Sequence, residues 1–228
     1  MGMKAKIALG AVVGIVVIGA VSANAGSNGK DSGSGSGKGS SASAEHTSGK
    51  KGSGDARAAG KKKAALAGDG EYQVGSDVKP GTYRTTGNTD DMCYWERAKD
   101  AKGELNSLLA NDNVTGTSYV TVKATDKIFK SSGCKDWEAV DPKAKGTPAS
   151  SMDGDGGMYE VGTDIAPGTY RSTGNTDDSC YWERTKNAEH GLDSIIANNN
   201  VKGTAVVTIG PGDAYFKTTG CGDWKKAA

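Results

Sequence analysis

Residues 80–97 read PGTYRTTGNTDDMCYWER, and residues 167–184 read PGTYRSTGNTDDSCYWER. The two stretches occupy equivalent places in an internal repeat, because residues 72–137 align with residues 159–224 at a constant offset of 87, without gaps and with 39 identities in 66 positions. A match of a chain to itself at a fixed spacing is typical of repeated structural units. The sequence therefore predicts two tandem modules with the same fold.

The residue pattern inside each copy favours β-strands. Residues 119–123 (YVTVK) and 205–209 (AVVTI) alternate Val or Ile with Thr, which is the period of a half-buried strand. Residues 82–85 follow a Pro-Gly turn dipeptide and precede the turn signal Gly87-Asn88, so a further strand is expected to end there.

Two short apolar runs, residues 105–110 and 192–197, could form a helical turn or a strand. We expect strands, because both runs are short and end in Asn or Asp residues that favour turns. About six short strands per copy, separated by Gly, Asn and Asp turns, predict an all-β chain with two small β-sandwich or barrel modules.

The cysteines predict one disulfide bond in each copy. Cys93 and Cys134 lie 41 residues apart, as do Cys180 and Cys221. Four cysteines allow three pairings, but two copies that fold independently in the same way select Cys93–Cys134 and Cys180–Cys221. Closing a loop of about 41 residues stabilises the fold by roughly 4 kcal/mol in the chain-entropy model, which matters for a module whose core is small.

The N-terminus, residues 1–25, predicts export. Residues 7–21 (IALGAVVGIVVIGAV) are uncharged and apolar, two lysines precede them, and Ala23-Asn-Ala25 has the spacing of a cleavage site. Counted to Ala23, the apolar run has 17 residues, the lower limit for a membrane span, so a cleaved signal peptide and an uncleaved anchor are both open. Either one exports the rest of the chain, so we expect an extracellular or cell-surface location.

Residues 26–70 hold 12 Gly and 9 Ser among 45 positions, with a net charge of +4, and predict a disordered stalk. A solubilising spacer is favoured over a segment that binds anionic surfaces. The modules then cover residues 71–140 and 158–228, and residues 141–157 are the expected linker. The whole chain has a net charge of +1, which gives no support for a nucleic-acid partner.

Several of these motifs occur together in a known family. Each copy contains, in order, PGTYR, CYWER, VT followed by Val or Ile, and a terminal F-x-x-x-G-C-x-x-W. This order of motifs resembles a module of exported proteins and lipoproteins of high-GC Gram-positive bacteria. The resemblance covers residues 72–137 and 159–224 and implies export and a disulfide-bonded β module, but no catalytic residues. This chain has no lipobox cysteine, so the resemblance does not extend to a lipid anchor.

Candidate ligand-binding residues follow from the strand period. In residues 93–96, side chains alternate, so Cys93 and Trp95 share the inner face while Tyr94 and Glu96 share the outer face. Outward aromatic residues beside charged ones suit sugar rings or a protein partner. The predicted ligand-binding set is Tyr94, Glu96, Arg97, Tyr181, Glu183 and Arg184.

No metal or cofactor is predicted. Asp90-Asp91, Asp177-Asp178 and the stretch 153–157 offer oxygen ligands, but their spacing does not match a calcium loop, and turn formation explains them. His46 and His190 have no counterparts in the other copy, so zinc and nucleophilic catalysis lack their residues.

The sequence therefore predicts an exported, surface-tethered, non-enzymatic protein that binds a cell-wall glycan or an extracellular protein through two homologous modules. It contacts the membrane only through its N-terminal segment, if that is retained. One alternative is a small secreted hydrolase, because three carboxylates recur in both copies: Asp77, Glu96 and Asp126 as Asp164, Glu183 and Asp213. Another is a purely structural surface spacer. The sequence leaves open whether the modules pack together.

Overall fold

The computed structural model describes residues 65–227, without the side chains of Asp90, Asp91, Asp177 and Asp178. The predicted export segment and most of the predicted stalk lie outside this range. Within it the chain is almost entirely β-structure, with two short 3₁₀ turns, which confirms the predicted all-β class with two tandem modules. No helix among these residues has the length and apolar character needed to cross a membrane.

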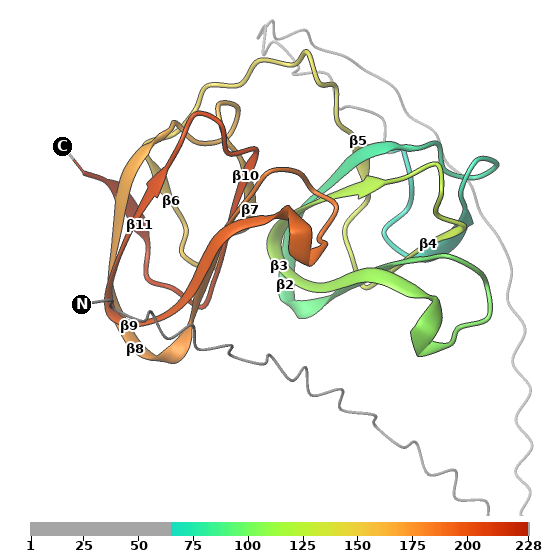
Figure 1. The fold of residues 1–228 in the computed structure, drawn as a ribbon, viewed down its shortest axis with the longest axis horizontal. Coiled ribbons are helices and arrows are strands. Elements are labelled where there is room, and N and C mark those ends of the chain that lie inside the picture. The colour runs from blue at the N-terminus through green and yellow to red at the C-terminus, as the bar shows by residue number, and fades with distance from the viewer. Residues whose placement is uncertain (1–64, 228) are drawn as a thin grey trace, which may run out of the picture. The chain divides into compact units, whose positions relative to one another are not determined.

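The first copy contains five strands and one 3₁₀ turn: β1 (Gly70–Gln73), β2 (Gly81–Ala98), η1 (Leu105–Ser107), β3 (Leu108–Val122), β4 (Ile128–Ser132) and β5 (Glu138–Ala139). The second contains six strands and one such turn: β6 (Ser151–Met152), β7 (Gly157–Glu160), β8 (Gly168–Thr185), η2 (Leu192–Ser194), β9 (Ile195–Ile209), β10 (Tyr215–Thr219) and β11 (Trp224–Lys226). Figure 1 shows the same long hairpin in both copies, β2–β3 and β8–β9. The expectation of short strands was wrong for these two hairpins, and the expected strands at 105–110 and 192–197 begin with a 3₁₀ turn.

The long strands bend at the predicted turn rather than ending there. β2 pairs with β3 on both sides of the turn signal, with register shifts on each side of Asn88. Gly87 has φ 73°, in the left-handed region that glycine enters readily. The first half of β2 pairs with β5 and the second half with β4, so each half of this strand has its own second partner besides β3. The sequence marks the position correctly, but the feature is a bulge inside one strand.

Asn88 holds this bend with its side-chain amide. It is buried, its Nδ2 donates to the Gly116 carbonyl at 3.0 Å, and its Oδ1 accepts from the Lys135 backbone N–H at 2.8 Å. Asn175 makes the equivalent bonds to Gly203 and Gly222 in the second copy. An amide that both donates and accepts replaces the ladder bonds that the bulge interrupts.

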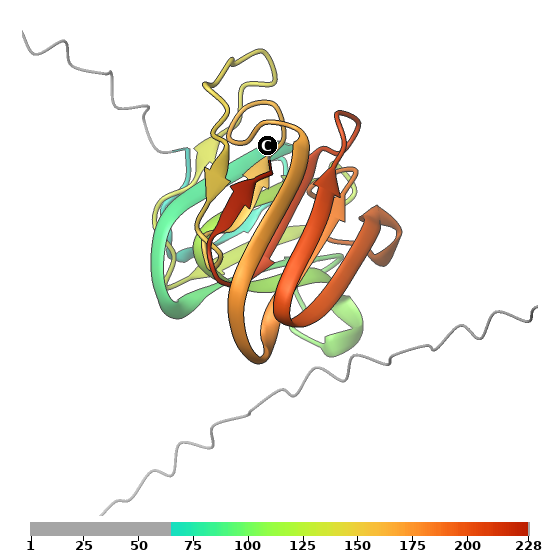
Figure 2. The same ribbon diagram turned by 90° about the vertical axis from the view of Figure 1, so that its left-hand side faces the viewer.

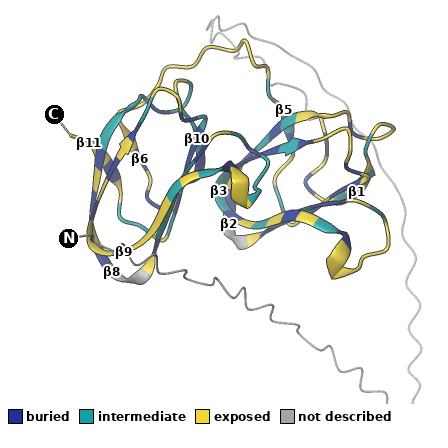
Figure 3. Ribbon diagram, in the orientation of Figure 1, coloured by how far each residue is buried: buried dark blue, intermediate teal, exposed yellow. Residues whose placement is uncertain are grey.

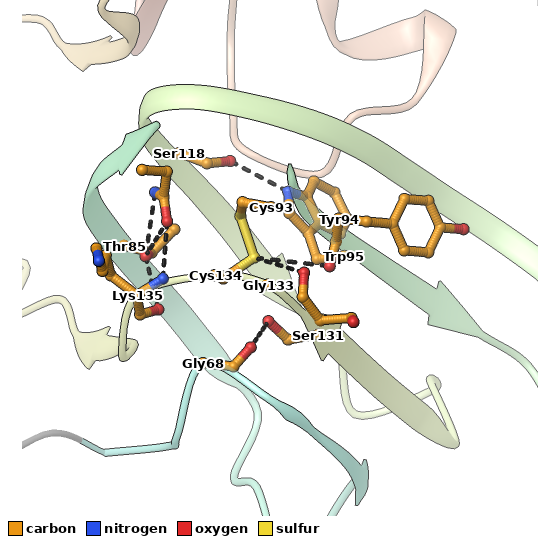
Figure 4. The surroundings of a disulfide bond; sticks show 12 residues. Gly68, Thr85, Cys93, Tyr94, Trp95, Ser118, Ser131, Gly133, Cys134 and Lys135 are labelled. Atoms are coloured by element: carbon orange, nitrogen blue, oxygen red, sulfur yellow. Dashed lines mark hydrogen bonds between the residues drawn. A yellow bond between two sulfur atoms is a disulfide. The ribbon is translucent and has the colours of Figure 1, made fainter. Parts of the chain in front are cut away.

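Each copy has its own aromatic core beside its disulfide. Cys93 is bonded to Cys134, with Trp95 beside the sulfur atoms and Tyr94 on the opposite face of the strand, as Figure 4 shows. The Phe129 ring lies 6.4 Å from Trp95 and 5.3 Å from Trp137, so it joins the two indoles in one cluster. Cys93, Trp95, Phe129 and Trp137 are each 0% exposed. Figure 3 shows buried stretches alternating with exposed ones along the strands of both copies. The second copy repeats the arrangement with Cys180–Cys221.

Ordered structure extends into segments that the sequence assigned to the stalk and the linker. Leu66 pairs with Trp137, and β6 pairs with β11. Gly68 approaches the Cys134 carbonyl so closely that a Cβ atom would lie 1.8 Å from its oxygen. The next residue, Asp69, accepts a hydrogen bond from the Gly133 N–H at 2.6 Å, and Asp155 does the same for Gly220 at 2.8 Å. A Gly-Asp pair therefore holds the disulfide loop in both copies.

The two copies pack together. A parallel bridge between Thr117 of β3 and Gly157 of β7 joins their sheets. Two backbone bonds reinforce it, from Thr117 N–H to Gly156 at 2.9 Å and from Thr121 N–H to Ala188 at 2.7 Å. Figure 2, turned by 90°, shows strands of the second copy in front of those of the first. The junction between the copies is therefore a region where residues distant in sequence meet.

Candidate functional site

Tyr119 of β3 is the central residue of the copy junction. Its hydroxyl donates to Asp164 Oδ2 at 2.6 Å, and its ring centroid lies 5.0 Å from that of Tyr215. The Arg84 guanidinium lies over the Tyr119 ring and 3.6 Å from Asp164. Burial, together with the Asp164 carboxylate, raises the pKa of Tyr119, so this hydroxyl stays protonated and donates.

The loop before η2 forms the second part of the junction. The Arg97 Nη1 donates to the Glu189 carbonyl at 2.8 Å, and the ring of His190 stands edge-on to Trp95 at 4.7 Å. His190 Nε2 lies 2.7 Å from the Tyr119 carbonyl oxygen. Burial lowers the pKa of His190, which leaves the imidazole neutral at neutral pH. A neutral ring in this geometry donates from Nε2 and leaves Nδ1 as an acceptor.

The copies differ in sequence at the junction residues. Tyr119 corresponds to Val206, and His190 corresponds to Gly103. Tyr119 is 1% exposed, whereas Val206 is 60% exposed. The junction is thus asymmetric, with each copy contributing residues that its counterpart lacks. The signal in the sequence is the set of positions where the two copies differ, since 39 of the 66 aligned positions are identical.

Arg97 and Arg184, both predicted as ligand-binding, form bidentate ion pairs inside their own copies. Arg97 donates to both carboxylate oxygens of Asp126, at 2.7 and 3.1 Å, and is 3% exposed. Arg184 makes the same pair with Asp213, at 2.6 and 2.9 Å. These fork-like pairs tie the long strand to the loop before the next strand. A ligand role for the two arginines stays a prediction.

The outward Tyr and Glu residues form a hydrogen-bonded pair in each copy. The Tyr94 hydroxyl donates to Glu96 Oε2 at 2.6 Å, and the Tyr181 hydroxyl donates to Glu183 Oε2 at the same distance. Burial and then the Glu96 carboxylate raise the pKa of Tyr94 to about 12. Asn198 also donates to the Tyr181 hydroxyl, at 3.1 Å. Sequence reasoning therefore placed these pairs correctly on the face opposite the disulfide.

The pair of the second copy lines a cavity of about 210 Å³ at the copy junction. The first copy contributes Asn111 and Asp112 from β3 to this cavity. The second copy contributes the larger share: Met158, Tyr181, Glu183, Thr185, Asn187, His190, Gly191, Ser194, Ile195 and Lys217. Two of the six residues predicted to bind a ligand thus meet at this cavity, which we call the junction cavity.

An ion pair between the copies lies in the wall of the junction cavity. Lys217 Nζ is 2.6 Å from Asp112 Oδ2, and both side chains are largely buried. Burial alone would lower the pKa of Lys217, but the Asp112 carboxylate outweighs it and raises the pKa above its ordinary value. Lys217 therefore stays charged, and its charge is balanced by the other copy.

Two buried hydroxyls in the wall have no hydrogen-bond partner among the described residues. They are Thr185 Oγ1 and Ser194 Oγ, on side chains 3% and 0% exposed. In the first copy the equivalent of Thr185 is Ala98, and the equivalent of Ser194 is Ser107, which donates to Asp100 at 2.6 Å. Buried polar groups are ordinarily paired, so these two hydroxyls mark hydrogen-bonding capacity that the fold itself does not use.

The carboxylates of the hydrolase alternative have separate structural partners. Asp77 accepts from the Gln73 N–H at 2.9 Å, Glu96 accepts from Tyr94, and Asp126 pairs with Arg97. Among the described side chains, no group of three or more His, Cys, Asp or Glu residues is placed to hold a metal ion. The aspartate pairs at 90–91 and 177–178, weighed above as calcium ligands, have side chains outside the description.

These features define a two-copy, disulfide-bonded β protein with an asymmetric polar cavity at the copy junction. The chain belongs to the Rv1352-like extracellular domain family, whose model matches residues 64–138 and 150–225. Uncharacterized protein Rv1352 of Mycobacterium tuberculosis H37Rv is 32% identical over 97 residues, which cover 37% of this chain and 78% of that protein. Uncharacterized protein Mb1387 of Mycobacterium bovis gives the same values. No solved structure matches the chain. The family confirms the predicted extracellular location.

Proposed function

We propose that this protein is a surface-tethered, non-enzymatic binding protein whose ligand is a cell-wall glycan. The observation that carries the proposal is the junction cavity, which contains the Tyr181–Glu183 pair and polar groups that the fold leaves without partners. An aromatic ring, a carboxylate and hydroxyls suit a ligand rich in hydroxyl groups. The extracellular family supports a ligand outside the cell.

A non-enzymatic role is favoured over the hydrolase alternative by the way the carboxylates are used. Glycoside hydrolysis needs two carboxyl groups on opposite sides of one bond, about 5 to 10 Å apart. In this chain Asp126 and Asp213 are held by arginines and Asp164 by Tyr119, so they serve as structural anchors. Glu183 then acts as a hydrogen-bond acceptor for the ligand.

The proposal is tested by co-sedimentation of residues 26–228 with purified cell-wall glycan from a high-GC Gram-positive bacterium. We expect saturable binding that is lost when both disulfides are reduced and the chain is unfolded, with the glycan recovered at its original length. Two matched variants test the cavity: Glu183→Gln changes its wall, and Glu96→Gln changes the equivalent position of the first copy. Only Glu183→Gln should weaken binding. Absence of saturable binding to glycan, or binding only to an envelope protein, would overturn the proposal.

A further inference from the structure

We infer that the junction cavity binds one neutral sugar ring, so that the chain recognises a terminal or branching unit of a glycan through a site built by both copies. The inference rests on the proposed function and specifies the ligand for the same site. It depends on three properties of the cavity: its size, its unused hydrogen-bonding groups and the balance of its charges.

The size fits a single ring. The volume of about 210 Å³ corresponds to the liquid volume of roughly seven water molecules. Pockets for drug-sized ligands are larger, about 300 to 1,000 Å³. Exposed Asn111 lies among the lining residues, so the cavity reaches the surface and a longer glycan can continue outside. One ring enters, and the rest of the polymer contributes little to recognition in the cavity.

The hydrogen-bonding groups match the rim of a sugar ring. The hydroxyls of Thr185 and Ser194 can each donate one bond and accept others, and neither is used by the fold. Glu183 and His190 line the same wall, and a neutral His190 that donates from Nε2 has an acceptor at Nδ1. A ring whose hydroxyls both donate and accept satisfies this mixture, whereas a purely accepting or purely donating ligand leaves part of it unpaired.

The charges favour a neutral ring. Asp112 and Lys217 neutralise each other across the junction, which leaves Glu183 as the remaining charge in the wall. An anionic ring would be repelled by the Glu183 carboxylate. A cationic ring would approach the buried ammonium of Lys217 and compete for its partner. Met158 and Ile195 add apolar surface for the C–H face of a sugar.

The test uses the two unpartnered hydroxyls, because removing them breaks no bond within the protein. Ser194→Ala and Thr185→Val should each weaken sugar binding about tenfold, the effect of one hydrogen bond near the upper end of its usual strength. The matched control is Ser107→Ala at the equivalent place in the first copy, where the hydroxyl already donates to Asp100. That variant should bind sugar as tightly as the unmodified chain.

Binding is measured by ¹H–¹⁵N chemical-shift titration of residues 26–228 with D-glucose, D-galactose and N-acetyl-D-glucosamine. D-glucuronate and D-glucosamine supply the anionic and cationic rings. We expect saturable shifts for at least one neutral sugar, centred on Ser194, Thr185 and Lys217, and weaker binding of both charged rings. Tighter binding of a charged ring, or shifts that do not respond to Ser194→Ala and Thr185→Val, would overturn the inference.

The outcomes separate this inference from the proposed function. If the glycan polymer binds but Ser194→Ala and Thr185→Val leave its affinity unchanged, the cavity assignment is wrong while the binding function stands. If neutral monosaccharides bind in the cavity but the polymer does not, the cavity assignment stands and the cell-wall function is wrong. If neither binds, both are wrong.

Discussion

Replacing His190 with Asn removes the imidazole buried at the copy junction and keeps the backbone that the position requires. His190 has φ 57°, in the left-handed region, which Asn tolerates better than most residues. The substitution deletes the edge-on contact with Trp95 and the bond to the Tyr119 carbonyl. We expect a less stable protein at every pH, and a stability that varies less with pH.

The pH dependence follows from the lowered pKa of His190. Burial is the main cause, and the nearby Asp112 carboxylate opposes it only in part. In the unfolded chain the imidazole titrates near pH 6.5. Below that pH the unfolded state binds a proton that the folded state excludes, so the free energy of unfolding falls as the pH falls. Between pH 7.5 and 5.5 the loss reaches at most about 1.4 kcal/mol, when the folded imidazole stays neutral throughout.

The assay is urea unfolding followed by tryptophan fluorescence at pH 7.5, 6.5 and 5.5 and constant ionic strength. Glu160, whose pKa is raised by burial, titrates in both proteins, so the difference between wild type and His190→Asn isolates the imidazole. The gap between the two unfolding free energies should narrow as the pH falls. Parallel pH profiles would show that His190 titrates in the folded protein as it does in the unfolded chain, and would refute the reasoning.

Three further substitutions test other parts of the structure. Replacing Cys93 and Cys134 together with Ala should lower the free energy of unfolding by roughly 4 kcal/mol, and thermal melting with and without reductant checks it, since reduction should no longer affect the first copy. Lys217→Met should lower the free energy of unfolding by about 2 kcal/mol, because it leaves Asp112 largely buried and unpaired. The control is Lys130→Met at the exposed equivalent position of the first copy, which should change the free energy of unfolding by less than about 0.5 kcal/mol in the same urea assay. Tyr119→Phe should cost about 1.5 kcal/mol, because Asp164 loses the hydroxyl that donates to it at 2.6 Å; an unchanged urea midpoint would show that this bond is not formed in solution.

Most of the fold follows from local sequence, whereas the junction does not. The repeat, the alternation around Trp95 and the spacing of Cys93 and Cys134 are properties of one short stretch or one pair, and they predict the strands and the disulfide. The sequence predicted that the strand ends at Gly87-Asn88, but the strand continues through a bend there. A turn signal indicates a change of chain direction, and it does not indicate whether strand pairing continues beyond the turn. The Tyr181–Glu183 pair was predictable from strand period.

The remaining cavity residues were not predictable, because the cavity depends on which faces of the copies meet. Asp112 and Lys217 are 105 residues apart, and neither has a pattern that links it to the other. Thr185 differs from its equivalent, Ala98, by having a hydroxyl. Ser194 has the same side chain as its equivalent, Ser107, but only Ser107 donates to an aspartate, Asp100. The sequence shows the positions where the copies differ. It does not show that several of these positions lie together at the junction.

The asymmetry of the junction changes what the duplication does. Two equivalent modules on a stalk would bind two ligands and gain affinity through linkage. Here the Tyr181–Glu183 pair lines a cavity that Asp112 of the first copy completes, and the first copy has Gly103 at the position of the lining residue His190. The copies meet once in each chain and form one junction cavity, so titration should give a stoichiometry of one sugar per chain. A stoichiometry of two would show that the copies bind independently and that the junction is not the binding site.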